Sequence, residues 1–298
     1  MSGSQRVYKQ RIRSTQTLKK VFRAMELIAA SRIGKARDRA LTATPYTEAL
    51  TQAVAAVANH SRTNHPLTTE RHDTTRVAVL VLTADRGMAG AYTANVLRAT
   101  ERLLEELDAQ DKDVDLFVAG RRGVSYFNFR GRELAGTWTG ESDSPTQKQA
   151  ADIADTLLER FLADRGDGGV GELHVVFTRF KSMVQQKVEV RRMLPLEVVD
   201  DDDDTEANQV LPLYEFVPSA DEVLDALLPL YVRSRIYNAL LHGAASELAS
   251  RQSAMHTATD NAEDLIRNYT RLANSARQAE ITQEISEIVS GADALASS

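Results

Sequence analysis

The residues best placed for chemistry follow a short apolar run. The segment from Arg76 to Thr83 reads RVAVLVLT, which predicts a buried strand, and the loop ADRGMAGAY comes directly after it. Gly87 and Gly90 in that loop could let the backbone approach a phosphate group. The loop lacks the lysine of GxxxxGK[ST] and the spacing of GxGxxG, so nucleotide binding here is an alternative and not the leading prediction.

Other catalytic and metal-binding patterns are missing from the sequence. The 298 residues include no cysteine and six histidines, and the histidines form neither HExxH nor a close ligand pair. There is no nucleophile elbow and no evident Ser/His/Asp arrangement. We therefore predict no catalytic residue, no cofactor site and no metal site.

Charge is divided between the two ends of the chain. Eleven Lys or Arg stand against two acidic residues between Arg6 and Arg39, and eighteen Asp or Glu stand against six Arg from Asp200 onward. Ends of opposite sign can attract each other, and the acidic carboxyl half would repel a polyanion. We expect pairing within the chain and no nucleic-acid partner.

The sequence also lacks the patterns of export and of membrane insertion. Its start, MSGSQRVYKQRIRS, is polar and basic. No window approaches the roughly 18 uninterrupted apolar residues that a membrane span needs. We expect a chain on the cytosolic side, with any membrane association made through a partner.

Long helices are predicted at both ends. Good helix formers run from about Gln5 to about Asn59, with a kink or restart expected at Pro45, and a second run extends from about Ser219 to about Ala292. The apolar stripe expected on the first helix consists of Leu18, Val21, Phe22, Met25, Ile28, Ala29, Ile33, Ala36 and Ala40. The last helix has heptad seams at Leu241, Leu248, Met255, Ala262, Tyr269, Ala276 and Gln283, and at Ala244, Arg251, Ala258, Leu265, Leu272 and Ala279.

Between the helices, short apolar strands alternate with helices, which is typical of an α/β domain. After the strand at 76–83 we expect a helix to about Ala109, strands at 115–119, 173–179, 184–193 and 213–216, and a helix at 147–163. The segments 61–75, 165–171 and 200–204 are expected to be solvated loops.

The economical architecture is a long antiparallel coiled coil of the N- and C-terminal helices with an inserted Rossmann-like α/β domain. Neither helix can bury its stripe alone, and the basic first helix can lie beside the acidic last one. The expected domains are residues 1–59, 60–217 and 218–298. Such a rod on a globular foot suggests mechanical coupling.

Three motifs carry a resemblance to a known family. RIRSTQTLKKVFRAMELIAASRIGKAR from Arg11 and ASELASRQSAMHTATDNAEDLIRNYTRLANSARQAEITQEISEIVSGADAL from Ala245 resemble the two terminal signatures of the gamma subunit of F-type ATP synthases. TADRGMAGAY is similar to the central motif of that family. Pro229 departs from the family pattern and leads us to expect a kink or a later start of the last helix.

The resemblance implies a noncatalytic central rotor shaft of a proton-translocating ATP synthase. The shaft would turn with the c-ring and drive the catalytic beta subunits through different nucleotide affinities, and it would contribute to regulation of ATPase activity. The implied partners are the alpha and beta subunits of the catalytic hexamer, the epsilon subunit and the c-ring, with one copy of this chain per complex. The implied location is the cytoplasmic side of the cell membrane, as a peripheral protein.

The family motifs also imply contact residues. Those carried over to the beta subunits are Lys20, Met25, Asp85, Arg86, Gly87, Arg251, Arg277, Gln278, Thr282 and Glu284, and Tyr214 is carried over to epsilon and the c-ring. A packing role is the alternative for each, above all for Met25 and Thr282.

Two other functions stay open at this point. A free-standing coiled-coil scaffold of another assembly would share the helices but would not need TADRGMAGAY. A nucleotide-dependent enzyme would need a ligand near Gly87 and Gly90.

Overall fold

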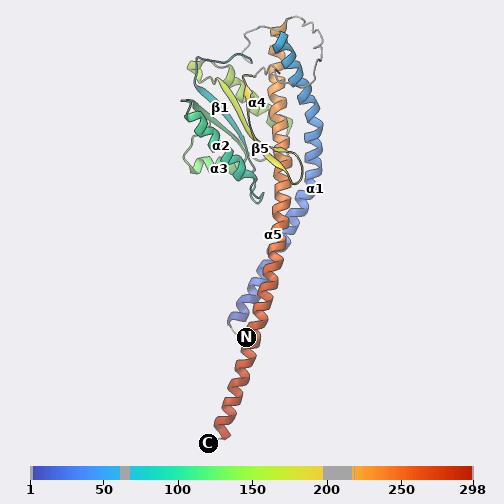
Figure 1. The fold of residues 1–298 in the computed structure, drawn as a ribbon, viewed down its shortest axis with the longest axis vertical. Helices are drawn as coiled ribbons and strands as arrows, with labels where there is room; N and C mark the ends of the chain where they lie inside the picture. Colours follow the sequence, from blue (N-terminus) through green and yellow to red (C-terminus); the bar gives the residue numbers. More distant parts are fainter. Residues whose placement is uncertain (1–2, 61–67, 197–216, 218, 297–298) are drawn as a thin grey trace, which may run out of the picture. The chain divides into compact units, whose positions relative to one another are not determined.

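The computed structural model describes residues 3–60, 68–196, 217 and 219–296 (Figure 1). Its elements are α1 (Gly3–His60), β1 (Arg76–Leu82), α2 (Tyr92–Asp108), β2 (Asp113–Ala119), α3 (Arg121–Phe129), β3 (Gly136–Trp138), α4 (Gln147–Leu162), the 3₁₀ turn η1 (Arg165–Asp167), β4 (Glu172–Phe180), β5 (Gln186–Leu194) and α5 (Ala220–Ala296). They form two compact units, a sheet unit of residues 30–250 and a coiled-coil unit of residues 1–29 and 251–298. Both α1 and α5 contribute to each unit.

The sheet unit is built on five strands in the order β3-β2-β1-β4-β5. The pairs β1 with β2, β1 with β4 and β2 with β3 are parallel, and β5 is antiparallel to β4. Six of the seven β1 residues are buried, because a central strand of a parallel sheet is covered on both faces. This confirms the α/β fold class.

Helices cover both faces of the sheet (Figure 1). Alternate β1 residues divide between two cores, since successive side chains of a strand point to opposite faces. Val79 belongs to the core under α2 and α3, and Leu80 to the core shared with α4 and α5. Phe117 belongs to the core shared with α4 and α5, and Trp138 packs against that core. Their rings stack, with centroids 6.3 Å apart.

The expected strands at 76–83, 115–119, 173–179 and 184–193 and the two helices correspond to β1, β2, β4, β5, α2 and α4. The short elements α3 and β3 were not predicted, because they carry no long apolar period. The expected strand at 213–216 and the acidic run 200–204 lie outside the described residues. The loop 165–171 is only partly solvated, since Val170 is fully buried.

Both helices continue through their prolines. Pro45 lies inside α1 and Pro229 inside α5, so the restart expected at Pro45 and the later start expected at Pro229 are wrong. Buried residues flank each proline, for example Leu228 and Tyr231 beside Pro229. Packing on both sides can offset the one backbone hydrogen bond that a proline removes.

The least exposed residues of α1 in the coiled-coil unit recur at alternating intervals of three and four. They are Gln5, Tyr8, Ile12, Thr15, Lys19, Phe22, Glu26 and Ala29, with Met25 beside them. Leu18, Val21 and Ile28 are 49%, 47% and 53% exposed, so their expected place in the buried stripe is wrong. The heptad is present, but polar residues occupy several of its inner positions.

The corresponding positions on α5 follow the same rule. They are Met255, Thr259, Ala262, Ile266, Tyr269, Ala273, Ala276 and Glu280. The first predicted seam therefore holds from Met255 to Ala276 but not at Gln283, which is exposed. The second predicted seam is displaced by one residue in this unit, because Leu265 and Ala279 are exposed while Ala273 is buried.

Candidate rotor interface

Side-chain contacts join α1 and α5 within the coiled-coil unit. The pairs are Arg11 with Tyr269, Lys19 with Glu263, and Glu26 with His256. The partner on α5 moves toward lower numbers as the residue on α1 moves toward higher ones. The two helices are therefore antiparallel, which confirms the predicted coiled coil. Lys19 of the basic first helix pairs with the acidic Glu263 of the last, whereas in the third pair the acid lies on the first helix.

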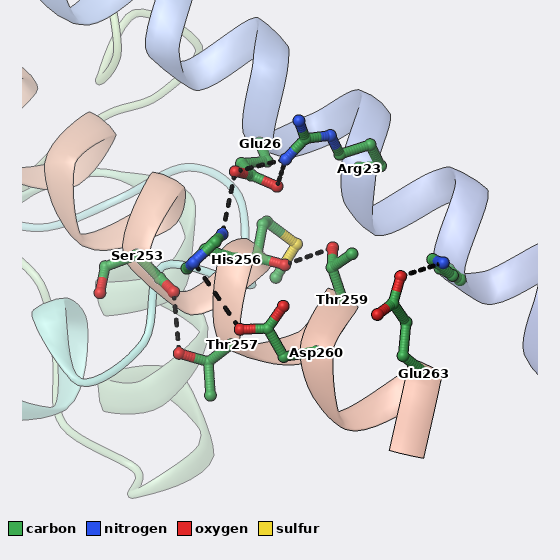
Figure 2. A network of polar contacts seen from close by, with 10 residues as sticks. Arg23, Glu26, Ser253, His256, Thr257, Thr259, Asp260 and Glu263 are labelled. Atoms are coloured by element: carbon green, nitrogen blue, oxygen red, sulfur yellow. Dashed lines mark hydrogen bonds and ion pairs between the residues drawn. The ribbon is translucent and has the colours of Figure 1, made fainter. Parts of the chain in front are cut away.

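The last of these three pairs contains a buried carboxylate (Figure 2). Glu26 is 8% exposed, and Nη1 of Arg23 donates to both of its oxygens at 2.9 Å. Nδ1 of His256 lies 3.2 Å from Oε1 of Glu26, and Nε2 of His256 lies 3.7 Å from a carboxylate oxygen of Asp260. A polar layer of this kind costs stability relative to an apolar one, but it fixes the register of two helices.

The apolar residues that the seam leaves out form a second face of α1. Leu18, Val21 and Ile28 lie on it, each about half exposed. Lys20 is also exposed, on a different side of the helix from Leu18. Met25 is half-buried, at the border between this face and the seam. This outer face presents apolar side chains to the surface, which suits contact with another protein.

The far part of α5 is exposed throughout its described side chains. Residues 281–290 are all exposed, including Ile281, Ile285, Ile288 and Val289. The family-derived residues Arg277, Gln278, Thr282 and Glu284 share this part of the helix and are exposed as well. Thr282 Oγ1 donates to the carbonyl of Gln278 at 2.9 Å, so one of these side chains also makes a contact within the helix.

Arg251 differs from the other family-derived residues of the coiled-coil unit. It is 6% exposed, at a predicted seam position where an apolar residue would be ordinary. The structure thus gives Arg251 a place among packed side chains, and its expected contact with a beta subunit stays a prediction.

The loop after β1 is held mainly by Asp85, in the sheet unit. The carboxylate accepts backbone N–H groups from Arg121 at 2.9 Å, Gly140 at 2.8 Å and Ser142 at 2.9 Å. Partial burial disfavours the charged form, but these donors outweigh it and hold the pKa of Asp85 below its ordinary value. Asp85 therefore fixes the loop, whatever else it contacts.

The surroundings of Asp85 favour exposure of the loop over nucleotide binding. Arg86 is exposed, and the Arg122 side chain lies near Gly87, 3.5 Å from where a Cβ would stand. A cavity beside Thr83 and Asp85 has a volume of about 10 Å³. Ligand pockets have volumes of roughly 300 Å³ or more, so this one does not support the nucleotide-dependent enzyme.

Tyr214, expected to face epsilon and the c-ring, lies outside the described residues. The outward position of Leu18, Val21 and Ile28 was missed, because apolar periodicity alone does not tell a buried stripe from an exposed one. Lys19 is adjacent to Leu18 and Glu26 lies two positions before Ile28, and both polar residues have partners on α5.

A family model described as ATP synthase matches residues 4–295. The ATP synthase gamma chain of Beutenbergia cavernae is 65% identical over 298 residues, which is the whole of both chains. The chain belongs to the ATP synthase gamma chain family. The gamma chain of Micrococcus luteus is 56% identical over 99% of each chain. These findings confirm the family predicted from the three motifs.

Chains in solved structures of ATP synthases share the fold. A chain from the Euglena gracilis mitochondrial ATP synthase, OSCP/F1/c-ring, has a TM-score of 0.66 at 13% identity, covering 99% of this chain and 95% of that chain. A chain from the Tetrahymena thermophila mitochondrial ATP synthase central stalk and c-ring has a TM-score of 0.55 at 21% identity, covering 80% and 99%. At these identities the likeness supports the fold.

Gamma chains are noncatalytic subunits of ATP synthase, a membrane-associated complex whose catalytic sites lie on the beta subunits. Among the described residues of this gamma chain, no helix is both long and apolar enough to cross a membrane. The same described residues contain no group of His, Asp and Glu arranged to hold a metal ion.

Proposed function

We propose that this chain is the central rotor shaft of a bacterial, proton-translocating ATP synthase. It couples rotation of the c-ring to ATP synthesis and hydrolysis in the catalytic beta subunits, and it contributes to regulation of ATPase activity. Family membership over residues 4–295 and 65% identity to a bacterial gamma chain support this function. The chain acts as one copy per complex, as a peripheral protein on the cytoplasmic side of the cell membrane.

The observation that carries the proposal is the outer face of the coiled-coil unit. Leu18, Val21 and Ile28 expose apolar area beside a seam whose inner positions hold Lys19 and Glu26. A chain that folded only for itself would bury the apolar residues and expose the charged ones. The inverted arrangement fits a rod that is surrounded by other proteins, here the alpha and beta subunits.

A shaft must also transmit torque between its ends. It can change the nucleotide affinity of a beta subunit only by contacting one conformation more favourably than another. The polar contacts of Lys19 with Glu263 and of Glu26 with His256 oppose sliding of α1 along α5. A fixed register keeps the outer faces of the two helices at one orientation while the shaft turns.

The proposed contacts fall into two groups. The beta subunits contact Lys20, Met25, Asp85, Arg86, Gly87, Arg251, Arg277, Gln278, Thr282 and Glu284, and Tyr214 faces epsilon and the c-ring. Exposure of Lys20, Arg86, Arg277 and Gln278 supports their part in the first group. For Asp85 and Arg251, both held within this chain, the proposed contribution is to shape the surface around them.

Native mass spectrometry tests the assembly. The chain is tagged, the membranes of its own cell are solubilised gently, and the masses of the purified complex are measured. We expect one copy with three alpha and three beta subunits. Recovery of the chain alone, or with partners unrelated to a hexameric ATPase, would favour the free-standing scaffold.

Variants of the outer face test the coupling. L18A/V21A/I28A removes apolar area that the isolated chain does not bury, and L162A removes an exposed leucine of α4 in the sheet unit as the matched control. In membrane vesicles, we expect the triple variant to lower proton pumping per ATP hydrolysed at least threefold and L162A to leave it unchanged. An unchanged ratio in the triple variant, with normal assembly, would contradict the proposed contact.

A further inference from the structure

A groove runs along α1 within the sheet unit, between α1, α5 and the start of α4, and we name it the α1 groove. Two cavities, of about 310 Å³ and about 700 Å³, form it, and Arg39 lines both. The α1 wall recurs at intervals of three and four residues from Arg32 to Thr47, and the α5 wall does so from Leu230 to Ala244. This spacing keeps each wall on one face of its helix, so the two cavities form one groove. Ligand pockets have volumes of roughly 300–1,000 Å³, and both cavities lie in this range.

The smaller cavity has a basic wall. Arg32, Lys35 and Arg39 of α1 line it, together with Asp143 and Ser144. Nη1 of Arg32 lies 2.7 Å from the Asp143 carboxylate, so these two charges compensate each other. Nη1 of Arg39 donates to Ser144 Oγ at 3.4 Å, and among the described residues no carboxylate pairs with Lys35 or Arg39. Two uncompensated cations one helical turn apart favour an anionic group at this end of the groove.

The larger cavity continues the groove with mainly apolar walls. Its apolar and aromatic side chains are Ala43, Tyr46, Ala150, Ala151, Leu230 and Tyr237. Tyr46 and Leu230 are 57% and 44% exposed, so they have apolar area that a ligand can cover. Asp38, the acidic residue of this cavity, pairs with Arg37 at 3.2 Å.

The polar side chains of the larger cavity have partners within the chain. Thr47 Oγ1 and Ser234 Oγ lie 2.8 Å apart, and Thr42 Oγ1 donates to a carbonyl of its own helix at 2.8 Å. Nε and Nη2 of Arg233 donate to Oδ1 of Asp155 at 2.9 and 2.7 Å. A ligand therefore needs no polar group at this end, and burial of an apolar one leaves no donor unpaired there.

The two ends set the length of a ligand that uses both. Tyr46 follows Lys35 by eleven residues, which is about 17 Å along a helix. A molecule that fills the groove has an anionic head, a long apolar body and a narrow cross-section. The guanidinium of Arg39 matches a carboxylate in shape, and the nearby Asp143 carboxylate disfavours a second negative charge on the head.

We propose that the α1 groove binds one long-chain fatty acid. The carboxylate pairs with Lys35 and Arg39, and the acyl chain lies against Ala43, Tyr46 and Tyr237. A phosphate monoester on one acyl chain shares this chemistry, and the single charge assigns the site to the carboxylate. Binding by the free chain does not depend on the proposed rotor function, so the two proposals can fail separately.

Isothermal titration of the full-length chain with sodium myristate, below its micelle concentration, measures the binding. Laurate and decanoate shorten the acyl chain by two and four carbons. K35E/R39E reverses the two cations at the head, whereas A43W fills the apolar end without a change of charge. R98E/R102E makes the same charge change on exposed residues of α2, which packs on the other face of the sheet, and is the matched control. Far-UV circular dichroism checks that each variant keeps its fold.

We expect a one-to-one isotherm for the unaltered chain and for R98E/R102E. Each two-carbon shortening should weaken binding at least threefold, because fewer CH₂ groups are buried. K35E/R39E and A43W should each weaken the binding of myristate at least tenfold. The dependence on acyl-chain length should persist in K35E/R39E and flatten in A43W, since only A43W blocks the apolar end.

Four results would overturn the proposal. The first is no binding of myristate, and the second is binding of several molecules with equal affinity in K35E/R39E and R98E/R102E, as a surfactant on any apolar surface would show. Tighter binding of myristoyl lysophosphatidate than of myristate would remove the assignment to a carboxylate. Loss of the site in the purified complex with alpha and beta subunits would show that a subunit occupies the groove.

Discussion

The two units of this gamma chain place apolar and polar residues in opposite ways. In the sheet unit, Val79, Leu80 and Phe117 are fully buried, as in any independent domain. In the coiled-coil unit, Glu26 is buried at the helix pair while Leu18 and Ile28 are exposed. The difference indicates that the sheet unit has an apolar core of its own, whereas the coiled-coil unit leaves apolar area exposed, which agrees with the proposed contact with other subunits.

The strongest test of this difference between the units is to truncate one leucine in each. L80A leaves a cavity in the sheet core and should lower the free energy of unfolding by about 3–4 kcal/mol. L18A should change it by no more than about 0.5 kcal/mol in the isolated chain. The measurement is a urea titration. Fluorescence of the single tryptophan, Trp138, follows unfolding of the sheet unit in L80A, and circular dichroism follows unfolding in both variants. Equal losses in the two variants would mean that Leu18 is buried in the free chain.

Asp85 tests whether the loop after β1 is part of the stable unit. D85A removes the acceptor of three backbone N–H groups and should destabilise the sheet unit by about 2 kcal/mol. D85N keeps one acceptor oxygen and should cost less. The measurement is the same Trp138 titration, and unchanged midpoints in D85A would show that the loop does not contribute to the fold.

The stability of the sheet unit should depend on pH. Burial lowers the pKa of His174, opposed by Glu172, and burial together with Arg179 lowers the pKa of His242, both in the sheet unit. The unfolded chain then binds more protons than the folded one, so stability falls as the pH drops below about 6.5.

Urea midpoints between pH 7.5 and 5 check this, with Trp138 as the probe. The double variant H174Q/H242Q should show a flatter profile than the unaltered chain. A urea midpoint that rises as the pH falls would contradict the predicted loss of stability. Loss of the Asp85 contribution is expected only further down, near and below pH 4, because the pKa of that carboxyl is lowered.

The smallest expected effect concerns the polar layer. Arg23 and His256 are exposed for more than half of their side-chain area, so water can replace their contacts with Glu26. E26L should therefore stabilise the coiled-coil unit, by about 1 kcal/mol. Amide hydrogen exchange of residues 12–29 and 255–276 should slow by roughly fivefold, since 1 kcal/mol is a factor of about five. Faster exchange in E26L would show that the ion pairs are a net source of stability.

Much of the fold could be predicted because the sheet unit obeys simple periodicities. RVAVLVLT reads as a buried strand and became β1, and the helices at the ends carry long runs of good helix formers. Three motifs identified the family. The short elements α3 and β3 could not be predicted, since packing against β2, and not their own sequence pattern, specifies them.

The inner seam of the coiled coil was harder to predict for a physical reason. Side-chain pairs between the two helices, such as Lys19 with Glu263, decide which positions face inward. The sequence of one helix alone does not show which charged residue has a partner. The role of Asp85 was hidden in the same way, because its donors Gly140 and Ser142 are 55 and 57 residues away.

The half-exposed Leu18, Val21 and Ile28 have a consequence for the cell that makes this chain. If the proposed subunits cover these side chains in the complex, a copy without its partners would keep them in water. Such a copy would be more prone to aggregation and to proteolysis than the assembled one.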